Sequence, residues 1–225
     1  MPNRAPTGAE INRETLYLDA YGMGVCDLLR DTEVNLGTPI NKQAFFNNLI
    51  DLMAGDGWLL SGSGFFSAVF VKNGLALKVG FKVTDTAATY AAWCRANQDL
   101  PGVPTVYSLT KFSRCFLVLT RRYNPLTPAW LQEDQPDYLP RMSDEYQALQ
   151  SAINCGKYWG LIRFDTVKTA KLIRDFFSGL ASFDLHGQNL MIDDQGNIVI
   201  TDPVCYGPCS DIGESYSSYS PAYTY

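Results

Sequence analysis

The sequence predicts an α+β protein with two lobes, in which a helical N-terminal extension precedes a sheet-rich lobe and a smaller second lobe. Three observations support this fold class. Apolar residues recur at helical spacing before residue 56, the pair Asn73-Gly74 joins two short apolar runs, and residues 166–182 form a helical pattern with one apolar stripe. The 225 residues are enough for one large domain or two small lobes.

The composition excludes several classes of protein. Apolar residues make up 46% of the chain and charged residues 18%, which supports a packed core. With a formal net charge of −5, we expect neither a nucleic acid nor a membrane as a direct partner. No apolar run is long enough to cross a bilayer, and residues 1–10 lack the apolar core of a secretory signal. The scattered cysteines favour reduced thiols over a metal site.

The first half of the chain changes from helical to strand patterns at Gly55-Asp56-Gly57. Before this point two apolar sets have helical spacing, the second of which includes Phe45, Leu49 and Met53. After it we expect strands at residues 68–71, 75–79, 103–107 and 115–119, and a helix at 86–98. The first two strands form a hairpin, because Asn-Gly suits the positive φ angles of a type I′ turn.

The second half begins with a stretch at 123–165 whose pattern is mixed and which contains prolines at first. The helix at 166–182 carries its apolar stripe at Leu172, Ile173, Phe176, Phe177 and Leu180. Short strands at 190–192 and 198–200 follow. We therefore expect an N-terminal helical extension at 1–56, a sheet lobe at 57–122, a reduced second lobe at 123–204 and a flexible tail at 205–225.

A glycine-rich stretch leads into the first predicted strand of the sheet lobe. It reads Gly62-Ser63-Gly64-Phe65-Phe66-Ser67-Ala68-Val69. Glycines let the backbone approach phosphate groups closely, so we expect residues 62–67 and Val69 to contact a nucleotide. Taken alone, the stretch is more often an ordinary glycine turn. No helix pattern follows it, which excludes a Walker A loop or a Rossmann turn.

Lys78 lies on the strand after the Asn-Gly hairpin, in the run Leu75-Ala76-Leu77-Lys78. Ala76 and Lys78 alternate onto the same face of that strand. The small side chain of Ala76 leaves room for an adenine ring, and Lys78 reaches the α- and β-phosphates. Without the other motifs, a surface lysine on an edge strand would explain the pattern equally well.

Two further motifs supply candidate catalytic and metal-binding groups. Asp184 opens the run Asp184-Leu185-His186-Gly187-Gln188-Asn189, where the aspartate can accept a hydroxyl proton and Asn189 can bind Mg²⁺. Asp202 follows a short apolar strand, and a hairpin between the two motifs would return it beside Asn189 as the second metal ligand. We expect His186 to brace the loop.

The order and spacing of these motifs resemble the protein kinase fold. More narrowly, residues 64–68, 77–82, 171–174, 181–186 and 200–204 are similar to the early serine/threonine kinases of lytic podophages. The resemblance covers about residues 55–206. It implies a protein-kinase-like two-lobed fold with a truncated C-terminal lobe, and an ATP- and Mg²⁺-dependent phage enzyme in the cytoplasm of the infected bacterium. Its phosphoacceptors would be host proteins of transcription and RNA processing. The C-terminal shutoff region of some members is not expected here.

The chain departs from ordinary kinases at several positions. No glutamate lies on the helix after Lys78, so Asp85, Asp99 or an acid of the extension such as Glu33 stays open as its partner. Ser182-Phe183 stands where His-Arg is usual, so regulation through a phosphorylated activation loop is not expected. Peptide docking would use residues 123–165 or the extension. We also expect that serines of the tail become autophosphorylated and that this reduces activity.

Two other functions remain open at this point. A short Asp-Leu-His-x-x-Asn motif also resembles aminoglycoside and choline kinases, but those carry a large helical acceptor lobe. A non-catalytic kinase-like binding module is the other alternative. The joint presence of Lys78, Asp184, Asn189 and Asp202 argues against it.

Overall fold

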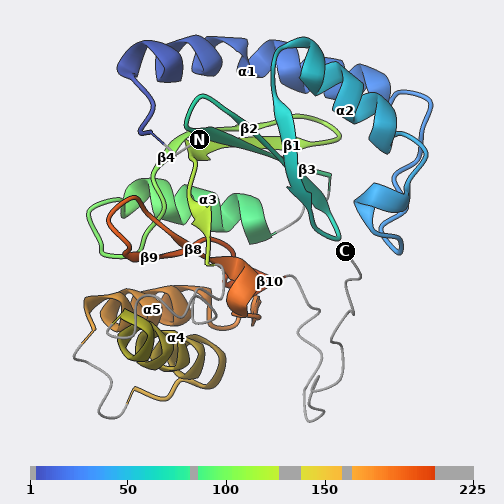
Figure 1. Cartoon of the computed structure of the whole chain (residues 1–225). Coiled ribbons are helices and arrows are strands. Elements are labelled where there is room, and N and C mark those ends of the chain that lie inside the picture. The colour runs from blue at the N-terminus through green and yellow to red at the C-terminus, as the bar shows by residue number, and fades with distance from the viewer. Residues whose placement is uncertain (1–3, 82–85, 127–137, 159–163, 206–225) are drawn as a thin grey trace.

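The computed structural model describes residues 4–81, 86–126, 138–158 and 164–205. Within them the helices are α1 (Gly8–Leu28), α2 (Phe46–Gly55), α3 (Thr86–Ala96), α4 (Tyr138–Cys155) and α5 (Asp165–Phe177), with short 3₁₀ helices η1 (Ile40–Lys42) and η3 (Gly187–Asn189). The elements lie in layers: α1 and α2 over the main sheet, α3 beneath it, and α4 and α5 at the opposite end of the molecule (Figure 1). The fold is α+β with two lobes and a small second lobe, as predicted.

The main sheet has five antiparallel strands in the order β1-β2-β3-β5-β4. The strands are β1 (Leu59–Ser63), β2 (Ser67–Lys72), β3 (Leu75–Gly80), β4 (Val106–Lys111) and β5 (Phe116–Arg121). The β2–β3 turn has φ angles of 49° at Asn73 and 77° at Gly74, which confirms the predicted Asn-Gly hairpin. The strand predicted at 103–107 begins three residues later than expected, at Val106.

One face of the main sheet packs against the N-terminal helices. Leu75, Leu77 and Val79 of β3 point to this face and are completely buried. They share a hydrophobic core with Val25 of α1 and Leu49 of α2. The N-terminal extension therefore covers the sheet, and the other face of β3, with Ala76 and Lys78, is turned toward the second lobe.

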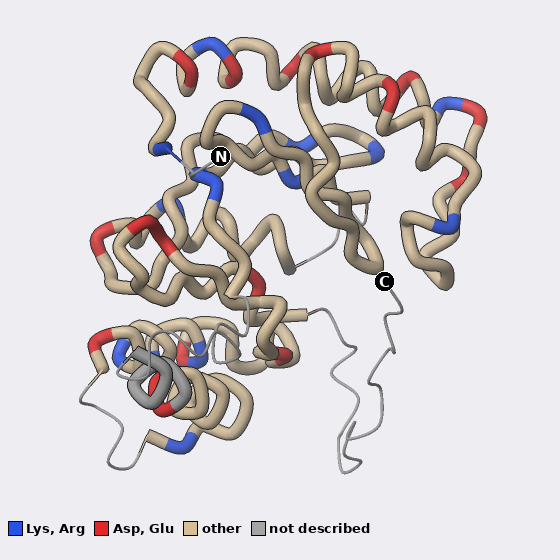
Figure 2. The backbone as a smooth tube through the Cα atoms, in the orientation of Figure 1, with Lys and Arg blue, Asp and Glu red and all other residues tan. Residues whose placement is uncertain are grey.

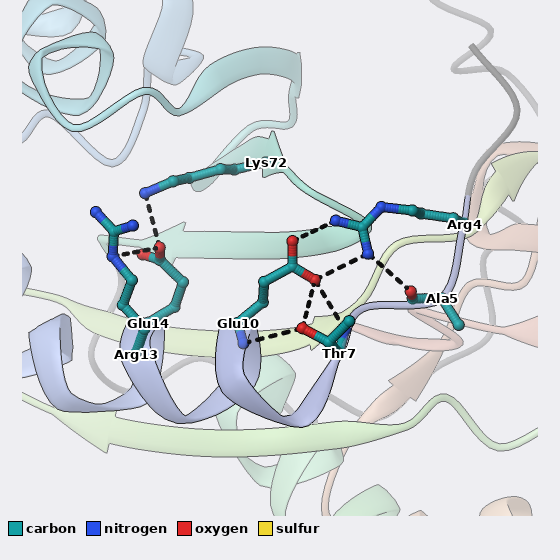
Figure 3. A network of polar contacts seen from close by, with 7 residues as sticks. All are labelled: Arg4, Ala5, Thr7, Glu10, Arg13, Glu14 and Lys72. Carbon is teal, nitrogen blue, oxygen red and sulfur yellow. Dashed lines mark hydrogen bonds and ion pairs between the residues drawn. The ribbon is translucent and has the colours of Figure 1, made fainter.

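A polar network fixes the start of α1 against the sheet (Figure 3). Thr7 and Glu10 form a reciprocal capping box at the helix start, and Arg4 pairs with Glu10. One helical turn later the buried carboxylate of Glu14 lies 2.7 Å from the Lys72 ammonium of β2. The Tyr21 hydroxyl donates a hydrogen bond to Glu14 at 2.8 Å, and burial is the main reason that the pKa of Tyr21 rises to about 12.

The second core joins α3 and the opposite face of the sheet to the rest of the chain. Phe116 and Val118 of β5 pack here together with residues of α3, α4 and α5, such as Tyr90, Ala152 and Ile173. A three-stranded sheet of β6 (Asn124–Pro125), β8 (Leu190–Ile192) and β9 (Ile198–Ile200) and a pair formed by β7 (Ser182–Phe183) and β10 (Val204–Cys205) complete this part. The predicted hairpin at 190–200 is thereby confirmed.

The structure adds to the sequence expectations for the second lobe in one place and corrects them in another. Residues 138–155 form the helix α4, within the stretch whose sequence pattern is mixed. Pro140 lies in the first helical turn, where the missing N–H costs little. The helix predicted at 166–182 ends at Phe177, because Ser178 leaves the helical conformation with a ψ of 125° and Gly179 has a φ of 77°. Its apolar residues also divide: Ile173 and Phe177 are buried, whereas Leu172, Phe176 and Leu180 are exposed.

None of the helices in the described residues is long and apolar enough to span a membrane. Acidic and basic residues are interspersed along the chain (Figure 2). The serines of the predicted tail, between residues 206 and 225, lie outside the described residues. The domain boundaries at residues 56, 122 and 204 stay predictions.

Candidate active site

Ala76 and Lys78 lie side by side on the face of β3 that is turned away from α1 and α2. Their neighbours on β2 are Val71 and Val69, and Lys78 has Val118 as its neighbour on β5. Residues directly opposite each other in a sheet share a face, so short side chains, the three valines and Thr120 opposite Ala76, flank Ala76 and the stem of Lys78. Both residues are only partly buried. The face can therefore accept a flat apolar group next to a cation.

The Lys78 ammonium forms an ion pair with Asp202. Its Nζ lies 2.7 Å from Oδ2 of the carboxylate, and 21% of the Lys78 side chain and 37% of the Asp202 side chain are exposed. Asp202 was not among the partners weighed from the sequence. Glu33 and Asp99 are exposed residues elsewhere on the chain, and Asp85 lies outside the described residues. The structure corrects the expectation: the acid comes from the second lobe.

The glycine-rich stretch connects β1 to β2, and β2 is the strand next to β3, which carries Lys78. Gly62 and Ser63 end β1, where they pair with Val69 and Ala68. The Gly64 N–H donates to the Ser67 carbonyl at 2.8 Å, which closes the turn. A Cβ at Gly62 would meet no atom within 4 Å. The space next to this glycine is therefore open to a ligand.

Backbone hydrogen bonds from outside the β1–β2 hairpin hold the turn at both of its phenylalanines. The carbonyl of Phe65 accepts from Ile40 N in η1 at 3.2 Å, and the carbonyl of Phe66 accepts from Phe81 N at 2.9 Å. The two rings meet edge to face with centroids 4.8 Å apart. Because Ile40 belongs to the N-terminal segment, the extension supports the glycine-rich turn as well as the sheet.

The loop from Asp184 to Asn189 is closed by its own hydrogen bonds. The Asn189 side chain donates to the Asp184 carbonyl at 2.7 Å. His186 Nδ1 accepts from the Gln188 N–H and caps η3, so the histidine braces the loop as expected. His186 Nε2 lies 4.0 Å from Asp184 Oδ2, and 60% of the Asp184 side chain is exposed. The carboxylate is thus accessible to an incoming hydroxyl group.

The β8–β9 hairpin brings the segment of Asp202 to Asn189. Leu190 pairs with Ile200, and both the N–H and the hydroxyl of Thr201 donate to the Asn189 carbonyl at 2.9 Å. On the far side of Asp202, the carbonyl of Pro203 accepts from the Asp184 N–H at 3.1 Å. Hydrogen bonds therefore connect the backbone segments that carry Asp184, Asn189 and Asp202.

Sequence reasoning missed Asn154 of α4, which holds the middle of the same loop. Its side-chain amide donates to the Leu185 carbonyl at 2.9 Å, and its Oδ1 accepts from the Leu185 N–H at 2.8 Å. A second donor to the Leu185 carbonyl is Gln150 Nε2, at 3.2 Å. Because α4 was not predicted as a helix, no sequence signal could have placed Asn154 opposite Leu185.

Mg²⁺ prefers hard oxygen ligands and commonly keeps several waters, with one or two protein ligands and the phosphates of the substrate. Asp202 offers a partly exposed carboxylate beside the segment of Asn189, which fits that preference. Within the described residues, no group of three or more His, Cys, Asp or Glu side chains gathers at one point. A metal here would therefore depend on oxygens of the nucleotide and water.

This chain is similar to one solved structure and to one protein family. A comparison with curated proteins gave no match. The crystal structure of Rad53 1-466 in complex with AMP-PNP matches with 17% sequence identity and a TM-score of 0.39. That match covers 65% of this chain and 37% of the Rad53 chain, so this chain spans little more than a third of that length.

The sequence model of the family described as "Bacteriophage T7 protein kinase 0.7" matches residues 26–216. These residues make up most of the chain and include the glycine-rich turn, Lys78, the loop from Asp184 to Asn189, and Asp202. The chain therefore belongs to the bacteriophage T7 protein kinase family.

Proposed function

We propose that this protein kinase transfers the γ-phosphoryl group of ATP to serine or threonine hydroxyls of proteins, with Mg²⁺ as cofactor. The observation that carries the proposal is the 2.7 Å contact between Lys78 and Asp202. It joins the face of the sheet that would hold a nucleotide to the loop that carries Asp184 and Asn189. Phosphoryl transfer requires this combination of phosphate-binding, metal-binding and base groups.

The nucleotide would lie against the sheet face around Ala76. Ala76 and Val69 would contact the adenine, and residues 62–67 would enclose the phosphates from above. Lys78 would donate to the α- and β-phosphates, which replace the Asp202 carboxylate as its anionic partner. The open space next to Gly62 supports this placement.

Asp202 and Asn189 would hold Mg²⁺, with the carboxylate as the charged ligand and the amide oxygen as the neutral one. Bound Mg²⁺ would neutralise the phosphate charge that develops during transfer. Since Lys78 occupies Oδ2 of Asp202 in this structure, the lysine would have to leave that oxygen when Mg²⁺ and nucleotide bind.

Asp184 would act as the general base. The acceptor oxygen attacks the γ-phosphorus, the bond from the γ-phosphorus to the β,γ-bridging oxygen breaks, and ADP leaves with that electron pair. Asp184 accepts the hydroxyl proton. Its exposure permits a protein side chain to reach it, and the bonds of Asn189 and Asn154 to the loop backbone hold it in place.

The protein substrates are proposed to be host bacterial proteins of the transcription and RNA-processing machinery, which places the enzyme in the cytoplasm of the infected bacterium. This part of the proposal rests on the family resemblance. Autophosphorylation of tail serines between residues 205 and 225 is proposed as a secondary reaction.

Incubation of the purified protein with γ-labelled ATP, Mg²⁺ and bacterial lysate tests the proposal. We expect labelled proteins that contain phosphoserine or phosphothreonine, and no label with Asp184→Ala. A labelled small molecule would instead indicate a phosphotransferase of the aminoglycoside or choline kinase type. No label in any fraction would indicate a non-catalytic binding module.

A further inference from the structure

A buried tyrosine of α3 contacts the strand that leads to Asp202. The Tyr90 hydroxyl donates a hydrogen bond to the Ile200 carbonyl at 2.7 Å, and Ile200 lies two residues before Asp202. Tyr90 is 2% exposed and Ile200 is fully buried. Burial first, and then the neighbouring Cys94 and Asp202, raise the pKa of Tyr90 well above its ordinary value. The hydroxyl therefore stays protonated and can act as a donor throughout the working pH range.

Hydrogen bonds from several parts of the chain fix the backbone between Ile200 and Pro203. The Ile200 N–H donates to the Gly102 carbonyl at 2.8 Å, Thr201 is bonded to the Asn189 carbonyl, and the Pro203 carbonyl accepts from Asp184 N–H. Tyr90 adds the contact that comes from a side chain of α3. The position of Asp202 thus depends on helix α3 as well as on the β8–β9 hairpin.

Helix α3 has no carboxylate to offer to Lys78. Its residues from Thr86 to Ala96 include neither aspartate nor glutamate, and the acid that pairs with Lys78 is Asp202 itself. The polar contact that α3 makes toward the site is directed at the Asp202 strand. Helix α3 therefore contacts the segment of Asp202, the partner of Lys78.

We propose that Tyr90 is a positioning residue for Asp202: its hydroxyl fixes the Ile200 carbonyl and thereby the direction in which the Asp202 carboxylate meets the metal and Lys78. This inference rests on the proposed function, in which Asp202 binds Mg²⁺. Without the hydroxyl, the buried Ile200 carbonyl loses its donor and must turn or take up water. The carboxylate two residues later would then shift from the metal position.

Tyr90→Phe is a suitable test because it removes only the oxygen. The ring of Tyr90 stacks on Trp93 and packs against Phe177, with centroids 6.0 Å apart in both pairs, and phenylalanine retains these contacts. Tyr21→Phe is the matched control. Tyr21 is also a buried tyrosine that donates one short hydrogen bond, but to Glu14, on the other side of the sheet.

The experiment measures two quantities for the wild type, Tyr90→Phe, Tyr21→Phe and Asp202→Asn. The first is the Mg²⁺ concentration that half-saturates phosphoryl transfer. The second, free of turnover, is Mn²⁺ binding in the presence of a non-hydrolysable ATP analogue, followed by electron paramagnetic resonance. We expect Tyr90→Phe to raise the half-saturating Mg²⁺ concentration and to weaken Mn²⁺ binding, each by about three- to tenfold, which is the effect of one lost hydrogen bond. Tyr21→Phe should lower Tm and leave both metal measurements at their wild-type values.

The outcomes separate this inference from the proposed function. If Asp202→Asn weakens metal binding and Tyr90→Phe does not, the role of Tyr90 is refuted and the metal site stands. If Asp202→Asn also binds metal like the wild type, the metal assignment and the Tyr90 inference fail together. Equal effects of Tyr90→Phe and Tyr21→Phe on the metal measurements would show that general destabilisation is the cause and would overturn the inference.

Discussion

The ammonium of Lys78 lies 2.7 Å from a carboxylate oxygen of Asp202, although the two residues are 124 positions apart in the chain. The pair connects the sheet that would hold the nucleotide to the hairpin that would hold the metal. It also answers a question raised by the sequence, in which the helix after Lys78 has no acid. One carboxylate here serves as the partner of the lysine and as the candidate metal ligand.

Lys78→Met should affect catalysis and Lys72→Met should affect stability, because these lysines lie on opposite faces of the sheet. Lys78→Met removes the phosphate-binding cation and should lower kcat/KM for ATP by roughly a hundredfold or more, with a small change in stability. Lys72→Met leaves the buried carboxylate of Glu14 without its nearest cation, which should cost about 3 kcal/mol of folding free energy without a change in KM for ATP. Urea unfolding and steady-state kinetics measure both; the same loss of ATP affinity in the two variants would contradict this assignment.

Gly62→Ala tests whether the glycine-rich turn contacts phosphates. The φ of Gly62 is not positive, and an added Cβ would meet no protein atom within 4 Å, so the fold should not change. If the turn encloses phosphates, the methyl group occupies ligand space, and KM for ATP should rise roughly tenfold at an unchanged Tm. Gly55→Ala is the control, since its Cβ also meets open space, away from the turn. Unchanged ATP affinity in Gly62→Ala would indicate an ordinary glycine turn.

Asn154→Leu tests the side chain that holds the loop of Asp184. Two hydrogen bonds to Leu185 are lost, so the loop should sample other conformations and kcat should fall roughly ten- to a hundredfold, with ATP affinity retained. Asn97→Leu is the control, because the Asn97 amide donates to the Trp93 carbonyl, away from this loop. The test compares kcat and KM for ATP of both variants with those of the wild type, with Tm measured in parallel. A wild-type kcat in Asn154→Leu would show that the clamp is not needed for transfer.

The start of α1 should depend on pH through Glu10. Its hydrogen bonds from Arg4 first, and then from Thr7, lower the pKa of Glu10 from 4.5 to about 2. A lowered pKa in the folded state means that the stabilisation is complete above about pH 4.5 and is lost as the pH falls through 2. NMR titration of the Glu10 carboxyl and the Thr7 amide measures this directly, with Glu10→Gln as the control that should not titrate. A Glu10 pKa near 4.5 would exclude the contacts of Glu10 with Arg4 and Thr7 in Figure 3.

The sequence predicted those parts of the fold that are encoded locally. The β2–β3 hairpin follows from the turn preference of Asn73-Gly74, and the β8–β9 hairpin follows from two short apolar runs with a polar turn between them. The same local rules placed Ala76 and Lys78 on one face and brought the Asp202 segment beside Asn189.

The rest depends on contacts that are remote in sequence. Lys78 was assigned no certain partner, because hydrophobic periodicity does not tell how the two lobes approach each other. Helix α4, and with it Asn154, was missed because only Leu149 and Ile153 are large among its buried residues, and the alanines beside them, Ala148 and Ala152, give a weak apolar signal. The exposure of Leu172 and Phe176 was missed for a related reason: a broad apolar stripe does not show which part another helix covers.

The most direct test of the central claim, that these residues form one phosphoryl-transfer site, is a comparison of transfer and binding in Asp184→Asn. Single-turnover transfer from γ-labelled ATP and equilibrium binding of a Mg²⁺–ATP analogue are measured on the same preparations of wild type and variant. We predict that transfer falls by about 10²- to 10⁴-fold, the usual contribution of a general base, while analogue binding changes little because Lys78, Asn189 and Asp202 remain. A variant that keeps most of its transfer rate would contradict the account.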